Sequence, residues 1–413
     1  MSLKIPEILA PAGSFASLRA AIKAGCDSVF FGISDFNMRA TASNNFTQED
    51  LPKLTSLCKE NKVKTYLTLN TVMYDSDLDR MRMVVDLAKK HHVTAIIAAD
   101  MATIAYAREQ GVEVHISTQI SISNIEGVKF YSQFSDRLVL ARELRLEQVA
   151  AIIEQIKERK IKGPSGRLVE IEVFAHGALC VSVSGRCGLS LHAYDRSANK
   201  GMCTQICRKK YKVTDEATGK ELVVDNNFIM SSADLCTIGF LQELVKAGVD
   251  VLKFEGRGRP PEYVFTVIRT YREALTAIED GTYSKQLVNK WNKRLKTVFN
   301  RGLSDGFYMG RKMNEWAKGD GSQATHTKVQ IGTVERYYPK INVAQVIVQA
   351  DQVLEINEQL LITSDKTGLV KTSLGEFLLD EKRVEKAVQG DSITFKIDEK
   401  VRKGDGVYVF RKK

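Results

Sequence analysis

The chain has 413 residues, of which 44% are hydrophobic, and it carries a formal net charge of +10. This length exceeds that of one ordinary compact domain, and the apolar content is sufficient for a large core. Because the sequence lacks both an apolar run of about 18 residues and an apolar signal segment at its start, it predicts a cytoplasmic protein that makes no contact with a membrane.

Short apolar runs alternate with amphipathic stretches through the first 260 residues. This alternation is typical of a parallel sheet covered by helices. Eight predicted strands indicate an α/β fold with a TIM-like (β/α) barrel, complete or distorted. The predicted strands are 7–10, 28–32, 64–69, 95–98, 113–117, 137–140, 172–174 and 251–254.

Residues 1–317 are predicted to form the barrel-like domain. A cysteine-rich insertion at 175–236 separates the seventh and eighth predicted strands, and the segment 262–317 is predicted to be helical. The Gly- and Ser-containing stretch 318–326 indicates a linker. Short β-branched and aromatic runs over 327–413 then predict a small C-terminal all-β barrel or sandwich.

The seven cysteines are unevenly distributed, which argues against a disulfide scaffold. Five of them fall within 57 residues of the predicted insertion: Cys180, Cys187, Cys203, Cys207 and Cys236. Four thiolates suit either tetrahedral zinc or a 4Fe–4S cluster. Only Cys203 and Cys207 have the close spacing usual in zinc sites, which disfavours zinc without excluding it. Buried structural thiols are the remaining interpretation.

Positive charge is concentrated around these cysteines. Residues 157–212 contain 12 Lys and Arg against 4 Asp and Glu, whereas residues 327–413 contain 15 against 13. The excess indicates either a solvated basic surface or an electrostatic track for a polyanion beside a reactive centre.

Candidate catalytic groups lie near the ends of predicted strands. His176 is close to Cys180 in the chain, so a Cys–His dyad and a structural histidine are both open interpretations. Glu143 and Glu255 each follow a predicted strand with an arginine nearby, which favours either proton transfer or an ion-pair network. The protease motifs H-E-x-x-H and G-x-S-x-G are absent from the sequence.

The stretch 172–190 resembles the signature of the collagenase-like peptidase family U32, and further similarity extends over essentially the whole chain. The matching positions are Glu172, Phe174, Gly177, Ala178, Leu179, Cys180, Gly185, Cys187, Leu189 and Ser190. The resemblance implies an iron–sulfur protein of oxygen-independent hydroxylation. It implies 5-hydroxyuridine formation at the tRNA wobble position, with prephenate implicated, while related branches hydroxylate an rRNA cytidine or the ubiquinone ring.

The resemblance also implies site residues. The implied cluster ligands are Cys180, Cys187, Cys203 and Cys236, with Cys207 as the alternate ligand. The candidate substrate-binding residues are Gln119, in the matching stretch 117–119, and Arg39, Arg142 and Arg257, whose guanidinium groups can bind the carboxylates of prephenate bidentately.

The leading prediction is therefore a tRNA hydroxylation enzyme with a 4Fe–4S cluster and tRNA as its partner, with or without a protein partner or homo-oligomerisation. A U32-type peptidase, a quinone-ring or rRNA hydroxylation factor, and a zinc-stabilised RNA-binding protein are the alternatives.

Overall fold

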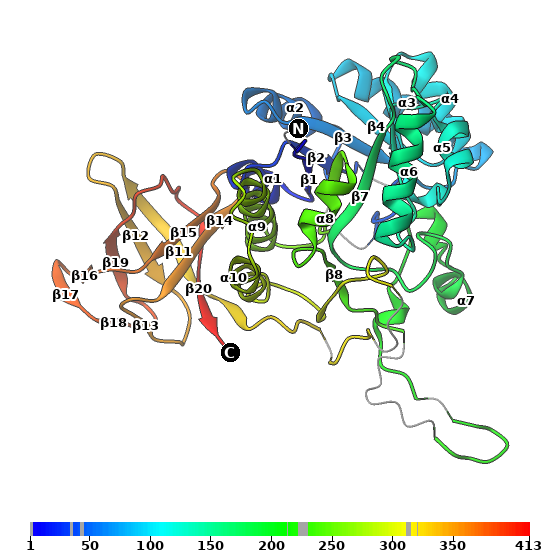
Figure 1. Cartoon of the computed structure of the whole chain (residues 1–413). Helices are drawn as coiled ribbons and strands as arrows, with labels where there is room; N and C mark the ends of the chain where they lie inside the picture. The colour runs from blue at the N-terminus through cyan, green and yellow to red at the C-terminus, as the bar shows by residue number, and fades with distance from the viewer. Residues whose placement is uncertain are drawn as a thin grey trace.

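Eight parallel strands form a closed barrel in the computed structural model of the chain (Figure 1), which describes residues 3–33, 36–41, 45–212, 214–221, 230–310, 315–319 and 321–413. The strands are β1 (Glu7–Pro11), β2 (Ser28–Phe31), β3 (Lys64–Leu69), β4 (Ala95–Ala98), β5 (Glu113–Ile116), β6 (Arg137–Val139), β7 (Glu170–Gly177) and β9 (Val251–Phe254). Strand β9 pairs with both β7 and β1, which closes the ring and confirms the predicted TIM-like barrel.

Helices between the strands cover the outside of the barrel. They are α1 (Phe15–Ala24), α2 (Leu51–Glu60), α3 (Leu78–Lys90), α4 (Met101–Glu109), α5 (Ile125–Tyr131), α6 (Leu146–Glu158), α8 (Leu241–Ala247) and α9 (Pro261–Glu279). Helix α3 shows the common pattern, because Met81, Val84, Val85 and Ala88 form one buried stripe against the strands. None of the described helices is long and apolar enough to cross a membrane.

The chain after α9 differs from the prediction. Helix α10 spans Lys285–Leu295, but a short strand, β10 (Leu303–Ser304), follows it. The predicted helical segment 262–317 is therefore wrong beyond α10. The helix already ends at Leu295, and the φ of +85° at Gly302 prevents a right-handed helix from resuming there.

The cysteine-rich insertion lies between β7 and β9, at the end of the barrel opposite the N-terminus (Figure 1). It contains α7 (Leu189–Tyr194), η3 (Ala198–Lys200), η4 (Ile206–Arg208) and β8 (Asp234–Cys236). Strand β8 runs antiparallel to the end of β7 and pairs with β10, so it lies outside the ring of eight. Two other short 3-10 turns, η1 (Asp75–Asp77) and η2 (Thr118–Ile120), follow β3 and β5 at the same end.

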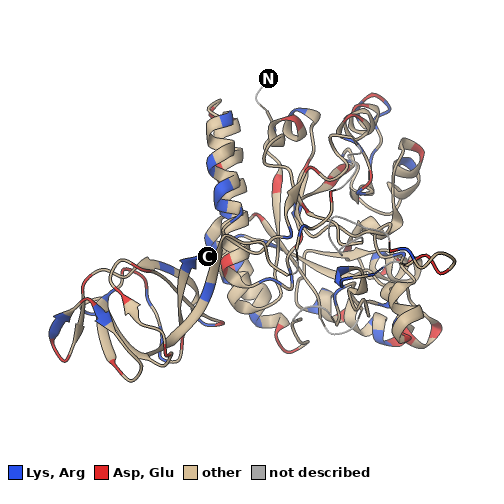
Figure 2. Ribbon diagram, turned by 90° about the horizontal axis from the view of Figure 1, so that it is seen from below, with Lys and Arg blue, Asp and Glu red and all other residues tan. Residues whose placement is uncertain are grey.

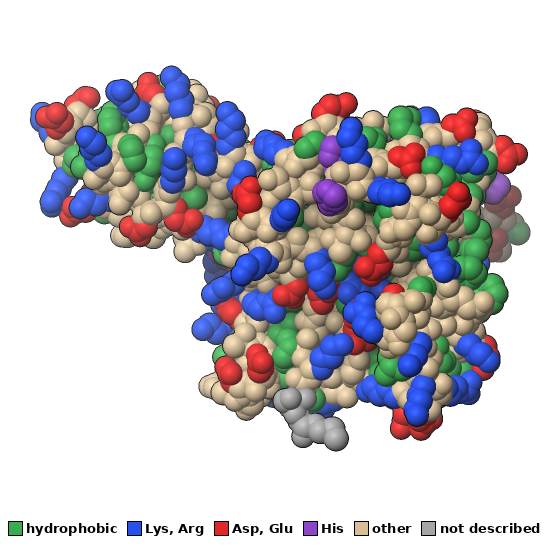
Figure 3. All heavy atoms as spheres, turned by 90° about the horizontal axis from the view of Figure 1, so that it is seen from above, with side chains coloured by type: hydrophobic (Ala, Val, Ile, Leu, Met, Phe, Trp, Pro, Cys, Tyr) green, Lys and Arg blue, Asp and Glu red, His purple; other side chains and the backbone are tan. Residues whose placement is uncertain are grey.

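An antiparallel all-β region follows the barrel and forms a lobe to one side of it (Figures 2 and 3). Its larger sheet contains β11 (His326–Tyr338), β12 (Val343–Val348), β14 (Gln359–Ser364), β15 (Gly368–Ser373), β16 (Phe377–Leu379), β17 (Lys382–Val384), β19 (Ser392–Lys396) and β20 (Gly406–Lys412), and its smaller sheet pairs β13 (Leu354–Glu355) with β18 (Lys386–Ala387). The lobe has its own apolar core and touches α1 through Ala20, Leu361 and Leu369. The all-β character is confirmed, whereas the exact domain boundaries stay a prediction.

Arg137 forms a buried ion-pair cluster at the amino-terminal end of the barrel. Its Nη1 and Nη2 each lie 3.0 Å from an oxygen of Glu7, and Nη2 lies 2.8 Å from Oε2 of Glu170. Nη1 also donates to the hydroxyl of Tyr66 at 3.1 Å. Burial alone would raise the pKa of Glu7, but hydrogen bonds and charge from Arg137 outweigh it and hold that pKa well below its usual range.

We expect Arg137→Met to lower the free energy of unfolding by about 3 kcal/mol, the lower end of the range for buried pairs. The partly buried carboxylates of Glu7 and Glu170 lose their shared cation, although Lys64 still pairs with Glu7. Urea unfolding followed by circular dichroism measures this loss. Arg159→Met is the matched control, since Arg159 pairs with Glu126 on the surface and such pairs contribute about 0–1 kcal/mol. Equal losses in the two variants would contradict the expectation.

The same cluster predicts a pH dependence. The pKa of Glu7 is lower in the folded chain than in the unfolded chain, so its stabilising contribution is present at neutral pH and is lost as the pH falls. The difference in stability between wild type and Arg137→Met should therefore shrink progressively below about pH 4. Repeating the unfolding series between neutral and acidic pH tests the sign.

Candidate active site

A cavity lies where the carboxyl ends of the barrel strands meet the insertion. Barrel strands and the loops after them contribute one side, including Phe30, Thr68, Asn70, Ser117, Phe174 and Lys253. The insertion contributes the other, including Val181, Ser184, Leu189, Ser190, Gln205 and Ile206. Active sites of (β/α) barrels occur at this end, because the loops there converge from several strands.

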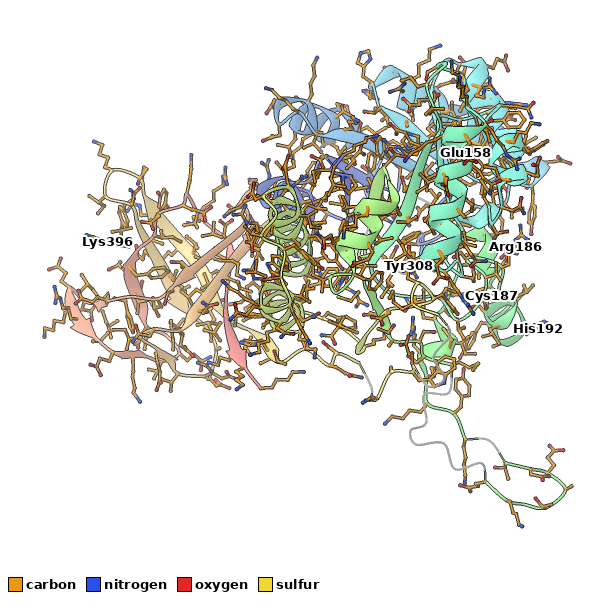
Figure 4. All side chains as sticks on the ribbon, in the orientation of Figure 1. Glu158, Arg186, Cys187, His192, Tyr308 and Lys396 are labelled. Atoms are coloured by element: carbon orange, nitrogen blue, oxygen red, sulfur yellow. The ribbon has the colours of Figure 1, made fainter. Side chains whose placement is uncertain are left out.

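Four thiols line this cavity: Cys180, Cys187, Cys203 and Cys207. Figure 4 labels Cys187 at the end of the molecule where α7 lies. Cys236, the fourth ligand implied by the sequence resemblance, is buried on β8 and is not among the described lining residues. Its thiol accepts a weak hydrogen bond from the Tyr271 hydroxyl at 3.8 Å and donates another to Oδ1 of Asn292 at 3.9 Å.

The four cavity thiols influence one another electrostatically. Burial raises the pKa of Cys207, Arg208 lowers it, and the nearby Cys180, Cys203 and Cys187 raise it further. A centre that accepts thiolate charge would relieve this repulsion, so the chemistry of the donor set fits a thiolate-bound metal group. Among the described residues, no three His, Cys, Asp or Glu side chains already form a metal site, so binding would require these side chains to converge.

Arginines form the polar wall of the cavity. Nε of Arg39 lies 3.2 Å from Oε1 of Glu255. Nη2 of Arg142 donates to the carbonyl of Ala178 at 2.9 Å, and Nη1 of Arg257 donates to Oγ1 of Thr68 at 3.0 Å. Arg142 and Arg257 each have a buried Nε without a hydrogen-bond partner in the described structure. Such donors are costly unless a ligand accepts from them.

Glu255 is ionised in this setting. Burial would raise the pKa of its carboxyl, but the charges of Arg39, Arg257, Arg142 and Lys253 outweigh burial and hold the pKa below its usual range. Burial lowers the pKa of Arg257 to about 10, so this arginine also remains charged at neutral pH. The cavity wall therefore carries more cations than carboxylates, which favours an anionic ligand.

A buried pair inside the barrel supports this wall. Nζ of Lys253 donates to Oε1 of Glu172 at 2.8 Å, and both side chains are buried. The sequence interpretation assigned neither of them to the site. The sequence did contain a signal for Lys253. Side chains two residues apart share one face of a strand, so Lys253 was expected to face the same side of β9 as the candidate Glu255.

The structure brings together most, but not all, of the predicted site residues. Gln119 lines the cavity and its Oε1 accepts from Nδ2 of Asn70 at 3.1 Å. Glu143 is exposed on the loop after β6, outside the cavity lining that the structure describes. His176 is also outside that lining and is buried against Tyr263 and Tyr271. Burial lowers the pKa of His176 to about 3, so its imidazole is neutral.

The model of peptidase family U32 matches residues 13–318. The chain belongs to this family. A Porphyromonas gingivalis protein named collagenase is 49% identical over 98% of each chain. The tRNA hydroxylation protein P1 of Bacillus subtilis is 34% identical and aligns with 74% of this chain and 72% of its own. The 23S rRNA 5-hydroxycytidine C2501 synthase of Escherichia coli is also 34% identical, over 74% of this chain and 46% of that protein.

The U32 signature has a clear structural place. It begins inside the barrel at Glu172, leaves β7 at Gly177 and continues along the cavity wall to Ser190. At Gly177 the backbone has a φ of +108°, and a Cβ atom there would lie 2.3 Å from the carbonyl oxygen of Glu255. This U32 glycine therefore lets β7 and β9 approach each other where the insertion starts.

We expect Gly177→Ala to cost more than about 2 kcal/mol of folding free energy, because the methyl group meets backbone and not a movable side chain. Gly166→Ala is the matched control: its φ is +78°, but a Cβ atom there meets nothing within 4 Å. The control should lose only about 1 kcal/mol from the left-handed backbone. Chemical denaturation compares the two, and equal losses would show that the close approach to Glu255 is unimportant.

Proposed function

We propose that this chain is an iron–sulfur enzyme of oxygen-independent RNA hydroxylation, which forms 5-hydroxyuridine at the wobble position of tRNA. The observation that carries the proposal is the gathering of four thiols and three arginines around one cavity at the mouth of the barrel. Relatives named for tRNA and rRNA hydroxylation support the reaction class.

The cavity thiols are the proposed ligands of a 4Fe–4S cluster, with zinc as the alternative metal. Cys180, Cys187 and Cys203 agree with the ligand set implied by resemblance, and the fourth ligand is proposed to be Cys207, because its thiol lines the same cavity. Cys236 remains the alternative fourth ligand. When bound, such a cluster supplies electron transfer or an open iron site for substrate.

The cationic wall is proposed to hold a carboxylate co-substrate, for which prephenate is the candidate. Replacing the C5–H bond of uridine with C5–OH is a two-electron oxidation. The co-substrate is therefore proposed to supply the oxygen from a C–OH group and to take up the two electrons, as its own carbon becomes C–H with the proton displaced from C5. Arg142 and Arg257 each have a buried Nε that a carboxylate could satisfy. The ionised Glu255 is the proposed acceptor of the proton that leaves the base.

Exposed tyrosines near the cavity support an RNA substrate. Tyr74, after β3, is 56% exposed, and Nζ of Lys200, which also pairs with Asp77, lies 4.3 Å from its ring centroid. Tyr194, in α7, is 47% exposed, and Nζ of Lys209 lies 5.0 Å from its ring centroid. An aromatic face beside a cation suits an unpaired base and its phosphate. We propose that these two pairs hold nucleotides flanking the target.

A peptidase is the second candidate, because the collagenase from P. gingivalis is similar over nearly the whole chain. A Cys–His mechanism needs an imidazole beside a cavity thiol. No histidine is among the described residues that line the cavity, and His176 is buried against tyrosine rings. The geometry therefore favours hydroxylation over thiol-dependent proteolysis.

Anaerobically purified wild-type protein should contain about four iron and four sulfide per chain and absorb visible light. Cys180→Ala, Cys187→Ala, Cys203→Ala and Cys207→Ala should each lose most of this iron, whereas Cys236→Ala should retain it. Cys58→Ala, in the core at α2, is the control for substitution of a buried thiol.

Iron loss in Cys236→Ala with full retention in Cys207→Ala would reverse the assignment of the fourth ligand. Colourless wild-type protein with one zinc per chain would overturn the iron–sulfur proposal altogether.

Deleting the gene should remove 5-hydroxyuridine from the organism's tRNA, as measured by mass spectrometry of digested nucleosides. Wild type should restore it, Cys180→Ala should not, and Tyr194→Ala should restore roughly a tenth, since one base–aromatic stack contributes about 1–3 kcal/mol. Phe130→Ala is the control, because Phe130 is 52% exposed on α5 and lies outside the proposed RNA surface.

Unchanged tRNA nucleosides in the deletion strain, together with peptide cleavage by metal-free protein, would favour the peptidase. Loss of a modified rRNA cytidine, or of a hydroxylated quinone, would retain the reaction class and change the substrate.

A further inference from the structure

A second, smaller pocket lies on the other side of the Arg39–Glu255 ion pair. It shares Arg39, Gln205 and Glu255 with the cysteine cavity, and Arg259 and Arg301 complete its cationic lining. Gly256 and Gly258, in the loop between β9 and α9, form part of its wall. The proposed reaction assigns no role to Arg259 or Arg301.

One aromatic ring orients the two additional arginines. The guanidinium carbon of Arg259 lies 3.4 Å from the ring centroid of Phe299, and that of Arg301 lies 5.1 Å from the same centroid. Cation–π contact engages the face of a guanidinium group and leaves its N–H edges available for other partners. The two guanidinium groups are thus held by Phe299 beside a pocket that both of them line.

Charge in this pocket is incompletely balanced. Arg39 pairs with Glu255, and Nη1 of Arg301 lies 3.5 Å from Oδ1 of Asp234. Within the described part of the chain, Arg259 has no carboxylate partner. Burial lowers the pKa of Arg259 and repulsion from Arg301 acts in the same direction, whereas Tyr263, Asp234 and Glu255 oppose them without outweighing burial. A bound anion would relieve both costs.

We propose that Arg39, Arg259 and Arg301 form a binding site for a single oxyanion group, either a phosphate or a carboxylate. Planar guanidinium groups bind both kinds of group bidentately. The site adjoins the cysteine cavity through Arg39 and Glu255, so an anion there would anchor a molecule that reaches toward the thiols. Binding of an oxyanion at this site does not depend on hydroxylation. Only the identity of the molecule that carries the oxyanion, an RNA or a small carboxylate co-substrate, rests on the proposed function.

Isothermal titration of the anaerobically purified full-length protein with inorganic phosphate, and separately with malonate, tests the site. Wild type should bind at least one of them saturably at millimolar concentration or below. Arg259→Gln should weaken that binding at least tenfold, and Arg259→Lys should fall between them, because it keeps the charge and loses the planar fork. Arg269→Gln should bind like wild type, since Arg269 is exposed on α9 and pairs only with Glu273 in the described structure.

Thermal unfolding gives a second measurement that does not depend on activity. Without added anion, Arg259→Gln should have a melting temperature equal to or above that of wild type, because the substitution removes an unpaired cation. At a concentration that saturates wild type, the anion that binds should raise the melting temperature of wild type by roughly 2 °C or more, and it should raise that of Arg259→Gln by clearly less.

RNA binding separates the two sources of the anion. If the site holds an RNA phosphate, Arg259→Gln should weaken binding of a single-stranded RNA oligonucleotide and lower its salt-dependence slope by about one. If the site holds a carboxylate, RNA binding should be unchanged while malonate binding is lost. Absence of saturable binding of both small anions to wild type, or equal binding by wild type and Arg259→Gln, would overturn the proposal. Wild-type protein that binds the anion but does not hydroxylate tRNA would instead count against the proposed function alone.

Discussion

The pairing of β9 with both β7 and β1 is the constraint on which the rest of the structure depends. Val251 is opposite Glu7 on one side and Glu172 on the other, so the eighth parallel strand closes the ring directly after a long insertion. Because β8 is excluded from the ring, the insertion remains at the mouth. The close approach at Gly177 joins the start of the insertion to Glu255, and this places thiols and arginines around one cavity.

Opposite charges are paired at successive levels of the barrel interior. Arg137 neutralises Glu7 and Glu170 at the amino-terminal end, and Lys253 pairs with Glu172 further along. Buried charges are tolerated in such pairs because each partner compensates the other's lost hydration. At the mouth the balance changes, since Arg142, Arg257 and Arg259 exceed the available carboxylate. These unpaired positive charges line the cysteine cavity and the oxyanion pocket, where a ligand can contact them.

Two of the proposed binding regions adjoin at Arg39 and Glu255, because the cysteine cavity and the oxyanion pocket share this ion pair. The proposed RNA contacts lie on neighbouring segments: Tyr74 follows β3, and Tyr194 is in α7, whose first residues line the cavity. The insertion contributes to all three regions through Cys203, Gln205 and α7. Its hydrogen bond from Val72 to Asn199 ties it to the loop after β3. One segment thus couples the proposed cluster to the proposed RNA surface.

The sequence alone determined the eight strands, the all-β lobe and the presence of a cysteine-rich insertion, because these depend on local hydrophobic periodicity and on chain order. The helix predicted beyond α10 was wrong, because helical periodicity does not show that the backbone leaves the helix after Leu295 and turns left-handed at Gly302. Only the tertiary structure decided which cysteines share a cavity and which polar groups face it. Residue type and spacing do not separate Cys236 from Cys207 as a ligand. In the structure, the pairing of β8 with β7 buries Cys236 beside Tyr271, while Cys207, in η4, lines the cavity. Such distances depend on strand pairing between distant segments, which periodicity cannot encode.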